Sequence, residues 1–357
     1  MKILTVVGAR PQFIKAAVVS LAIADAPGLT EHLLHTGQHY DERMSDIFFS
    51  EMGIPEPTYR LNVGGSSHGA MTGQMLAEIE QVLQKESYDC LLVYGDTNST
   101  LAGALAAVKL HVPVAHVEAG LRSFNKAMPE EINRILTDHV STTLFCPTDI
   151  AVENLSNEGL TGDHIHQVGD VMYDAAIRFG AHPSVARAAI LNDVGVSPGE
   201  YMLATIHRAE NTDDPTRLEN ILNALNWAAE RVAVVLPLHP RTVSKLPSDF
   251  QPHINLKIIE PVGYLDMLAL ERNAKAIATD SGGVQKEAYF QRVSCVTFRD
   301  QTEWVELVET GWNRLASPSV SEQLVAGIES ALNEKGCDVP LYGGGDAAQK
   351  IARILAN

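Results

Sequence analysis

The sequence has few cysteines, and it lacks any long apolar run. Its four cysteines, Cys90, Cys146, Cys295 and Cys337, form no CxxC pair and show no even spacing. The first three lie inside apolar strand-like segments, which predicts reduced, buried thiols and a cytoplasmic protein. No apolar run approaches the roughly 20 residues that span a bilayer, and the N-terminal MKILTVVG is typical of a strand rather than a signal peptide. We therefore expect no membrane partner.

Positive charge is also scarce. Lys and Arg number 27 against 44 Asp and Glu, which gives a net charge of −17. Nucleic acid is excluded as an expected partner, because phosphate backbones are bound by clustered Lys and Arg. A small phosphorylated ligand is not excluded, because it needs only a few local cations and N–H groups.

The motifs of common cofactors are missing as well. There is no GxGxxG and no Walker P-loop, so dinucleotide and ATP binding gain no support. His116 lies two residues before Glu118, on the same side of a predicted strand, but two ligands do not make a zinc site. We expect neither a metal nor another cofactor.

The chain does contain an alternation of short apolar runs with longer segments of helical spacing. Ten strands are predicted: 3–7, 33–36, 90–94, 112–117, 144–146, 202–205, 233–236, 256–259, 276–278 and 295–298. Helices are predicted over 99–110, 217–230 and 264–273. Such alternation predicts an α/β fold with parallel sheets covered on both faces.

The length of 357 residues, 45% of them hydrophobic, exceeds one ordinary core, so we expect two domains. Residues 169–200 hold no clear strand and carry Pro183 and Pro198, which makes them the expected join. The predicted domains are 1–170 and 171–345, followed by a terminal helix. Two parallel-sheet domains predict a cleft between their carboxyl edges.

The stretch from His116 to His139 concentrates charge in an otherwise apolar region. Glu118 ends a predicted strand, and Pro129 fits the first turn of a helix. On that helix Glu130 and Arg134 are four residues apart and are expected to share a face. Two acids on a strand end and a helix are typical of enzyme sites at a sheet edge.

Two further segments of the first domain end predicted strands. Arg10 follows the first strand and is expected to point into the cleft, with Lys15 in the first turns of the next helix, where an anion is favoured. The alternative is a surface arginine before a proline turn. Asp96 follows the third strand, where it is either a catalytic acid or an ordinary helix N-cap.

In the second domain, His207 and His239 end consecutive strands. A cleft-facing histidine suits proton transfer; a structural histidine is the competing interpretation.

The segment from Thr279 to Glu287 is the second strong feature of the chain. Ser281, Gly282 and Gly283 form a small-residue turn ahead of a helix, whose free N–H groups suit a diphosphate. Glu287 is placed to accept hydrogen bonds from ribose hydroxyls. A plain glycine turn is the alternative.

Six segments occur in this order: GARPQFIK, YGDTNSTLAG, HVEAGLRSF, MPEEINRILTDH, TIHRAEN and TDSGGVQKEA. Together they closely resemble the non-hydrolysing UDP-N-acetylglucosamine 2-epimerases, over essentially the whole chain. The resemblance implies two Rossmann-like domains as in GT-B glycosyltransferases, with helix 346–357 packing back on the first. It also implies a homodimer that uses a UDP-sugar without metal or nicotinamide.

The resemblance implies a reaction that avoids direct removal of the weakly acidic C2 proton. The family interconverts UDP-GlcNAc and UDP-ManNAc by eliminating UDP to a 2-acetamidoglucal and adding it back, which requires a base, an acid and a closed site. The acids match Asp96, Glu118 and Glu130, and the histidine matches His207. The UDP-sugar contacts match Arg10, Lys15, Arg134, His239, Ser281, Gly282, Gly283 and Glu287. We assign Asp96 and Glu130 to proton transfer. Glu118 either shares in proton transfer or stabilises charge, and His207 assists departure of the diphosphate leaving group.

Some positions depart from the family pattern. Gln12 stands in place of an acid, and residues 64–69 replace a segment that binds an activating second UDP-GlcNAc, so we predict little activation by substrate. RPQFIK and TEWVE resemble a branch acting on UDP-2,3-diacetamido-2,3-dideoxyglucuronic acid, whose carboxylate needs a cation such as Arg122 or Lys126. A GT-B glycosyltransferase is the alternative of another class.

Overall fold

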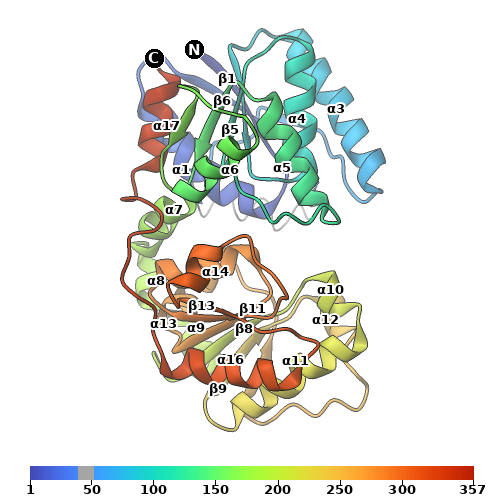
Figure 1. Cartoon of the computed structure of the whole chain (residues 1–357), viewed down its shortest axis with the longest axis vertical. Coiled ribbons are helices and arrows are strands. Elements are labelled where there is room, and N and C mark those ends of the chain that lie inside the picture. The colour runs from blue at the N-terminus through green and yellow to red at the C-terminus, as the bar shows by residue number, and fades with distance from the viewer. Residues whose placement is uncertain (39–51) are drawn as a thin grey trace. The chain divides into compact units, whose positions relative to one another are not determined.

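The computed structural model describes residues 1–38 and 52–357, and these form two compact units. The first unit comprises Met1–Arg178 and Pro340–Asn357, and the second comprises Phe179–Val339. Each unit is a parallel sheet with helices on both faces (Figure 1).

The first unit contains a seven-stranded sheet in the order β3-β2-β1-β4-β5-β6-β7. Its strands are β1 Lys2–Val7, β2 Thr30–His35, β3 Tyr59–Arg60, β4 Cys90–Tyr94, β5 Val114–Val117, β6 Thr143–Cys146 and β7 Ile165–Gln167. Its helices are α1 Arg10–Asp25, α3 His68–Lys85, α4 Asn98–Lys109, α5 Pro129–Val140, α6 Asp149–Asn157, α7 Val171–Gly180 (which runs into the second unit) and α17 Ala347–Leu355. The terminal helix α17 packs against α1, and its Ala348 N–H donates to Asp174 Oδ2 at 2.7 Å.

The second unit contains a six-stranded sheet in the order β10-β9-β8-β11-β12-β13. Its strands are β8 Tyr201–Thr205, β9 Ala233–Pro237, β10 Leu256–Ile259, β11 Ala276–Thr279, β12 Ser294–Thr297 and β13 Asn313–Leu315. Its helices are α8 Pro183–Arg187, α9 Ala189–Val194, α10 Ala209–Thr212, α11 Pro215–Ala229, α12 Pro240–Val243, α13 Tyr264–Asn273, α14 Gly282–Phe290, α15 Val305–Glu309 and α16 Ser321–Asn333.

The central strands are buried on both faces, which is why they appear in the sequence as continuous apolar runs. In β8, Met202 and Ala204 pack into the core under α11 and α16. Tyr201 and Leu203 point the other way, into the core with α9, α13 and α14. The period-2 alternation of a strand therefore fills two cores from one apolar segment.

Each sheet reverses its strand order at one point, and these points organise the site. The reversal lies between β1 and β4 in the first unit and between β8 and β11 in the second. In open parallel sheets, ligands bind beyond the carboxyl ends of the strands at such a switch point. The residues that follow these four strands are therefore the first place to look for chemistry.

Candidate active site

Gln12 joins the two strand ends at the switch point of the first unit. Its Oε1 accepts hydrogen bonds from the Gly8 and Ala9 N–H groups at 2.8 and 3.0 Å. Its Nε2 donates to the Tyr94 carbonyl at 2.8 Å and to Thr100 Oγ1 at 2.9 Å. A carboxylate has no N–H to donate, so the amide at this position has a structural reason of its own.

Lys15 and Glu118 form a buried ion pair at this edge. Both side chains are 9% exposed. Glu118 directly follows β5, as predicted, and has a left-handed backbone with φ 72°. A β-carbon on Gly95 would lie 3.2 Å from both the Glu118 carboxylate and the Lys15 ammonium, so a glycine there leaves room for the pair. The left-handed backbone of Glu118 is unfavourable for a residue with a side chain, so the surroundings must hold it there. Such strained residues are typical of functional sites.

Arg10 is the first residue of α1 and is half-buried. Lys15, one turn further along the same helix, is the residue that reaches Glu118.

Asp96 lies between β4 and α4 and forms an ion pair with Arg134. It is not the cap of α4, because Thr97 occupies that position and accepts the Thr100 N–H. The Asp96 carbonyl also accepts from Asn133 Nδ2 at 2.9 Å. Asp96 is thus held at the sheet edge from α5, with its carboxylate about one-third exposed.

Glu130 and Arg134 lie four residues apart on α5, but they differ in burial, and the ion pair of Arg134 on this helix is with Glu131. Arg134 is 4% exposed and pairs with Glu131, which is completely buried, at 3.0 Å. Glu131 also accepts from Ser123 N–H at 2.9 Å, while Glu130 is exposed. Helix α5 buries the side that carries residues 131, 134 and 138, three and four positions apart, and this side leaves Glu130 outside.

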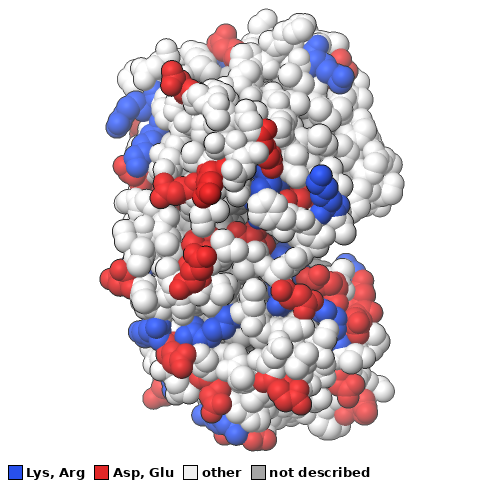
Figure 2. Space-filling view, viewed as in Figure 1, with Lys and Arg blue, Asp and Glu red and all other residues white. Residues whose placement is uncertain are grey.

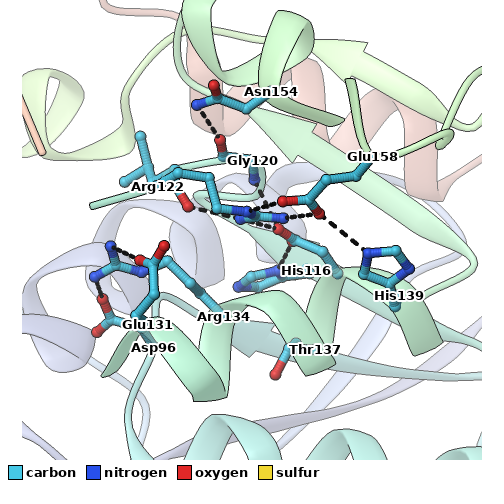
Figure 3. A network of polar contacts seen from close by, with 12 residues as sticks. Asp96, His116, Gly120, Arg122, Glu131, Arg134, Thr137, His139, Asn154 and Glu158 are labelled. Atoms are coloured by element: carbon cyan, nitrogen blue, oxygen red, sulfur yellow. Dashed lines mark hydrogen bonds and ion pairs between the residues drawn. The ribbon is translucent and has the colours of Figure 1, made fainter. Parts of the chain in front are cut away.

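Arg122 is committed to two acids and is the wrong candidate for binding a substrate carboxylate. Its Nη1 donates to Asp138 at 2.7 Å, while Nε and Nη2 donate to the two oxygens of Glu158 at 2.6 and 2.7 Å (Figure 3). Its side chain is 1% exposed. Lys126, by contrast, is exposed.

At the switch point of the second unit, Asp280 organises the turn that carries His207. The Asp280 carboxylate is completely buried and accepts from the His207 and Arg208 N–H groups at 3.1 and 3.0 Å and from Asn211 Nδ2 at 3.2 Å. His207 Nδ1 lies 3.0 Å from Asp280 Oδ1, and the imidazole is 56% exposed. Burial would raise the pKa of Asp280, but its contacts with His207 and with backbone N–H groups outweigh burial and lower that pKa below its ordinary value. Asp280 thus orients His207 so that Nε2 faces away from it.

The helix α14 begins in the small-residue turn. Ser281 is its N-cap and accepts the Val284 N–H at 3.5 Å, while Gly283 is exposed. A β-carbon on Gly282 would lie 2.6 Å from the Glu303 carboxylate, which pairs with Arg299 at 2.9 Å.

Glu287 is buried on α14, 7% exposed. His239 is exposed and caps α12, where its Nδ1 accepts the Arg241 N–H at 3.3 Å. The structure therefore gives His239 a local role as a helix cap.

In the described ranges 1–38 and 52–357, no three His, Cys, Asp or Glu side chains come together as metal ligands. Within those same residues no helix is long and apolar enough to cross a membrane. On the face shown in Figure 2, the described Lys and Arg residues are interspersed with Asp and Glu rather than gathered in a continuous basic patch.

Comparison with known proteins places the chain among nucleotide-sugar enzymes. Residues 21–356 match the family described as UDP-N-acetylglucosamine 2-epimerase. The UDP-2,3-diacetamido-2,3-dideoxy-D-glucuronate 2-epimerase of Pseudomonas aeruginosa is 54% identical, with 100% of this chain and 99% of the relative covered. The UDP-N-acetylglucosamine 2-epimerase of Methanocaldococcus jannaschii is 45% identical, with 99% of each chain covered.

Solved structures agree over the whole chain. The Methanocaldococcus jannaschii UDP-GlcNAc 2-epimerase in complex with UDP-GlcNAc and UDP has a TM-score of 0.91 at 44% identity, with 99% of each chain covered. The UDP-GlcNAc 2-epimerase from Neisseria meningitidis bound to UDP-GlcNAc has a TM-score of 0.90 at 30% identity, again with 99% of each chain covered. The predicted fold class, two Rossmann-like α/β domains, is confirmed.

Proposed function

Because the chain belongs to the UDP-N-acetylglucosamine 2-epimerase family, whose members are isomerases, we propose that it inverts C2 of a UDP-linked 2-acetamido sugar. The reaction proceeds by elimination of UDP to a 2-acetamidoglucal, followed by re-addition of UDP with protonation of C2 on the other face. This route needs carboxylates for proton transfer and donors for the diphosphate.

The strongest support for this reaction is the placement of reactive groups at the two switch points. Each sheet carries a cluster of reactive groups at its own switch point, with carboxylates and cations in the first unit and an oriented histidine beside a helix N-terminus in the second. Asp96 and Glu118 supply acids in the first cluster, and His207 and Ser281 lie in the second. A UDP-sugar epimerase needs these two kinds of group, one for the sugar and one for the diphosphate.

We assign the same roles as from the sequence, and the exposure and contacts of each residue support them. Asp96 and Glu130 exchange the C2 proton, and both carboxylates are accessible to solvent. Glu118, paired with Lys15, stabilises the oxocarbenium-like centre. His207, oriented by Asp280, assists departure of the diphosphate. The remaining contacts to the UDP-sugar are assigned to Arg10, Lys15, Arg134, His239, Ser281, Gly282, Gly283 and Glu287.

Two substrates are candidates. UDP-GlcNAc is the ligand in the solved structures from Methanocaldococcus jannaschii and Neisseria meningitidis. UDP-2,3-diacetamido-2,3-dideoxy-D-glucuronate is favoured by the 54% identity with the Pseudomonas aeruginosa enzyme. With Arg122 committed to Asp138 and Glu158, Lys126 is the exposed cation left from the two proposed for a uronate carboxylate.

The test is to incubate the purified protein with each UDP-sugar in D₂O and follow C2 by NMR. Deuterium at C2 of a gluco/manno mixture is expected for the true substrate, because the proton is lost to solvent and returned. Glu130→Gln should abolish exchange while UDP still binds. Transfer of the sugar to an acceptor, with no deuterium at C2, would instead identify a glycosyltransferase and contradict the proposal.

We also infer that the protein works as a homodimer in the cytoplasm. The dimer follows from family resemblance and is checked by light scattering of the eluting protein. A reducing compartment agrees with the four free cysteines: burial raises the pKa of the Cys90, Cys146 and Cys295 thiols to about 12, which keeps them inert.

A further inference from the structure

A buried network of charges connects the ends of β4 and β5 with helix α5 (Figure 3). His116, on β5, lies with its Nε2 2.7 Å from the Gly95 carbonyl oxygen and its Nδ1 2.7 Å from Asp138 Oδ1. Both side chains are completely buried. The family resemblance assigns no role to either of them.

The contacts of His116 determine its protonation. The Gly95 carbonyl accepts hydrogen bonds and cannot donate, so Nε2 must carry a proton. Asp138 Oδ2 accepts from two further donors, Arg122 Nη1 at 2.7 Å and Gly120 N–H at 3.1 Å, and contacts with His116 and Arg122 outweigh burial and hold the pKa of Asp138 below its ordinary value, so its Oδ1 is an acceptor. Nδ1 must therefore carry a proton as well, and His116 is an imidazolium. The charged groups around it are Asp138, Arg122 and, beyond Arg122, Glu158.

The same contacts fix the two turns that carry candidate acids. Gly95, which accepts from His116, immediately precedes Asp96. Gly120, which donates to Asp138, lies two residues after Glu118 and has φ 82°. Asp138 itself belongs to α5, the helix that carries Glu130. The network thus contacts the backbone beside Asp96 and near Glu118, and it shares helix α5 with Glu130.

We propose that His116 and Asp138 are positioning residues for the epimerase reaction: their ion pair holds the Gly95–Asp96 turn and the Glu118–Gly120 turn at a fixed separation. The inference rests on the proposed function. A buried ion pair contributes little net stability, because desolvation offsets most of its attraction, but it fixes geometry strictly. Outer-shell partners that orient metal ligands cost about 10–100-fold in activity when removed, and we expect a loss of the same order for residues that orient catalytic carboxylates.

The kinetic test uses Asp138→Asn, which keeps the shape of the side chain and removes its charge. We expect kcat for C2 exchange to fall by about 10–100-fold while KM and the Kd for UDP change by less than about threefold, because the binding groups stay in place. The matched control is Glu158→Gln, which removes a charge from the outer side of Arg122 and touches neither turn. It should lower the melting temperature yet leave kcat within about threefold.

An independent test detects the imidazolium in the unmodified protein. With ¹⁵N-labelled histidine at the pH of the kinetic assay, the His116 ring should show protons on both nitrogens, because each nitrogen faces an acceptor. The ring is identified by its nuclear Overhauser contacts to Gly95, so no variant needs to fold. A His116 ring with a single protonated nitrogen would overturn the assignment.

The outcomes separate the two proposals. Exchange in the wild type that is unchanged in Asp138→Asn, or lost equally in Glu158→Gln, would overturn the positioning role alone. No exchange in the wild type with either UDP-sugar would overturn the proposed function and the positioning role together.

Discussion

Replacing Asp280 with asparagine removes the negative charge on which several N–H donors converge. The carboxylate accepts from the backbone N–H groups of His207 and Arg208, from Asn211 Nδ2 and from His207 Nδ1. An asparagine keeps one oxygen, and its NH₂ group faces donors that it cannot satisfy. About two charge-assisted bonds are lost at about 1.5 kcal/mol each, so the free energy of unfolding should fall by about 3 kcal/mol.

The effect of Asp280→Asn on the free energy of unfolding should depend on pH. The pKa of Asp280 is lower in the folded protein than its ordinary value of 3.8, so its contribution to stability is fully present above about pH 4. That contribution is lost as the pH falls through the lowered folded pKa. The stability difference between the wild type and Asp280→Asn should therefore shrink toward acid.

Urea unfolding at about pH 7 and at about pH 3 measures both quantities. The matched control is Asp249→Asn, an exposed acid of the same unit, which should change stability by less than about 0.5 kcal/mol. A loss at Asp280 no larger than that of the control, or a difference that grows toward acid, would refute the reasoning. If stability falls but C2 exchange does not, Asp280 holds the turn without serving His207.

Three further results are expected. Glu131→Gln should lower the free energy of unfolding by about 1–3 kcal/mol, because Glu131 is buried with several donors, whereas the exposed Glu130→Gln should lose C2 exchange and change stability by less than about 0.5 kcal/mol; chemical denaturation of both variants checks this. Gly282→Ala should weaken UDP binding about tenfold by calorimetry, because its methyl group would lie beside the helix N–H groups proposed for the diphosphate and would push away the Glu303 carboxylate, 2.6 Å distant. Initial rates should rise hyperbolically with UDP-GlcNAc, since residues 64–69 lack the segment expected for an activating site; a sigmoidal curve would contradict this.

The long apolar patterns predicted the architecture well, because central strands and amphipathic helices are selected by burial. The strands 90–94 and 256–259 and the helix 264–273 have the predicted bounds. Three short strands were missed: β3, β7 and β13. All three lie at the edges of their sheets, and their sequences YR, IHQ and NRL contain no apolar run, as edge strands commonly do not.

The sequence indicated which residues lie at the sheet edges, but it did not indicate which of their side chains contact one another. Lys15 and Glu118 are 103 positions apart, and only the fold brings them together. Helical spacing alone did not identify the partner of Arg134, because two adjacent acids, Glu130 and Glu131, both lie within reach along a helix. The buried face of the helix selects Glu131. The spacing of Glu131, Arg134 and Asp138 in the sequence could have indicated that these three residues share the buried face.

The two switch points stabilise their carboxylates with different kinds of partner. At the switch point of the first unit, Glu118 pairs with Lys15 and Asp96 pairs with Arg134, so each of these two acids has a cationic side chain as its partner. In the second unit, the charge of Asp280 is stabilised by the His207 imidazole and by backbone N–H groups of the turn that carries it. Side-chain cations can shift when a substrate arrives, whereas backbone donors are fixed by the chain. In the proposed mechanism, Asp96, which takes or returns the proton, lies beside a side-chain cation that can move, and His207, which meets the diphosphate, lies on a turn held by backbone donors.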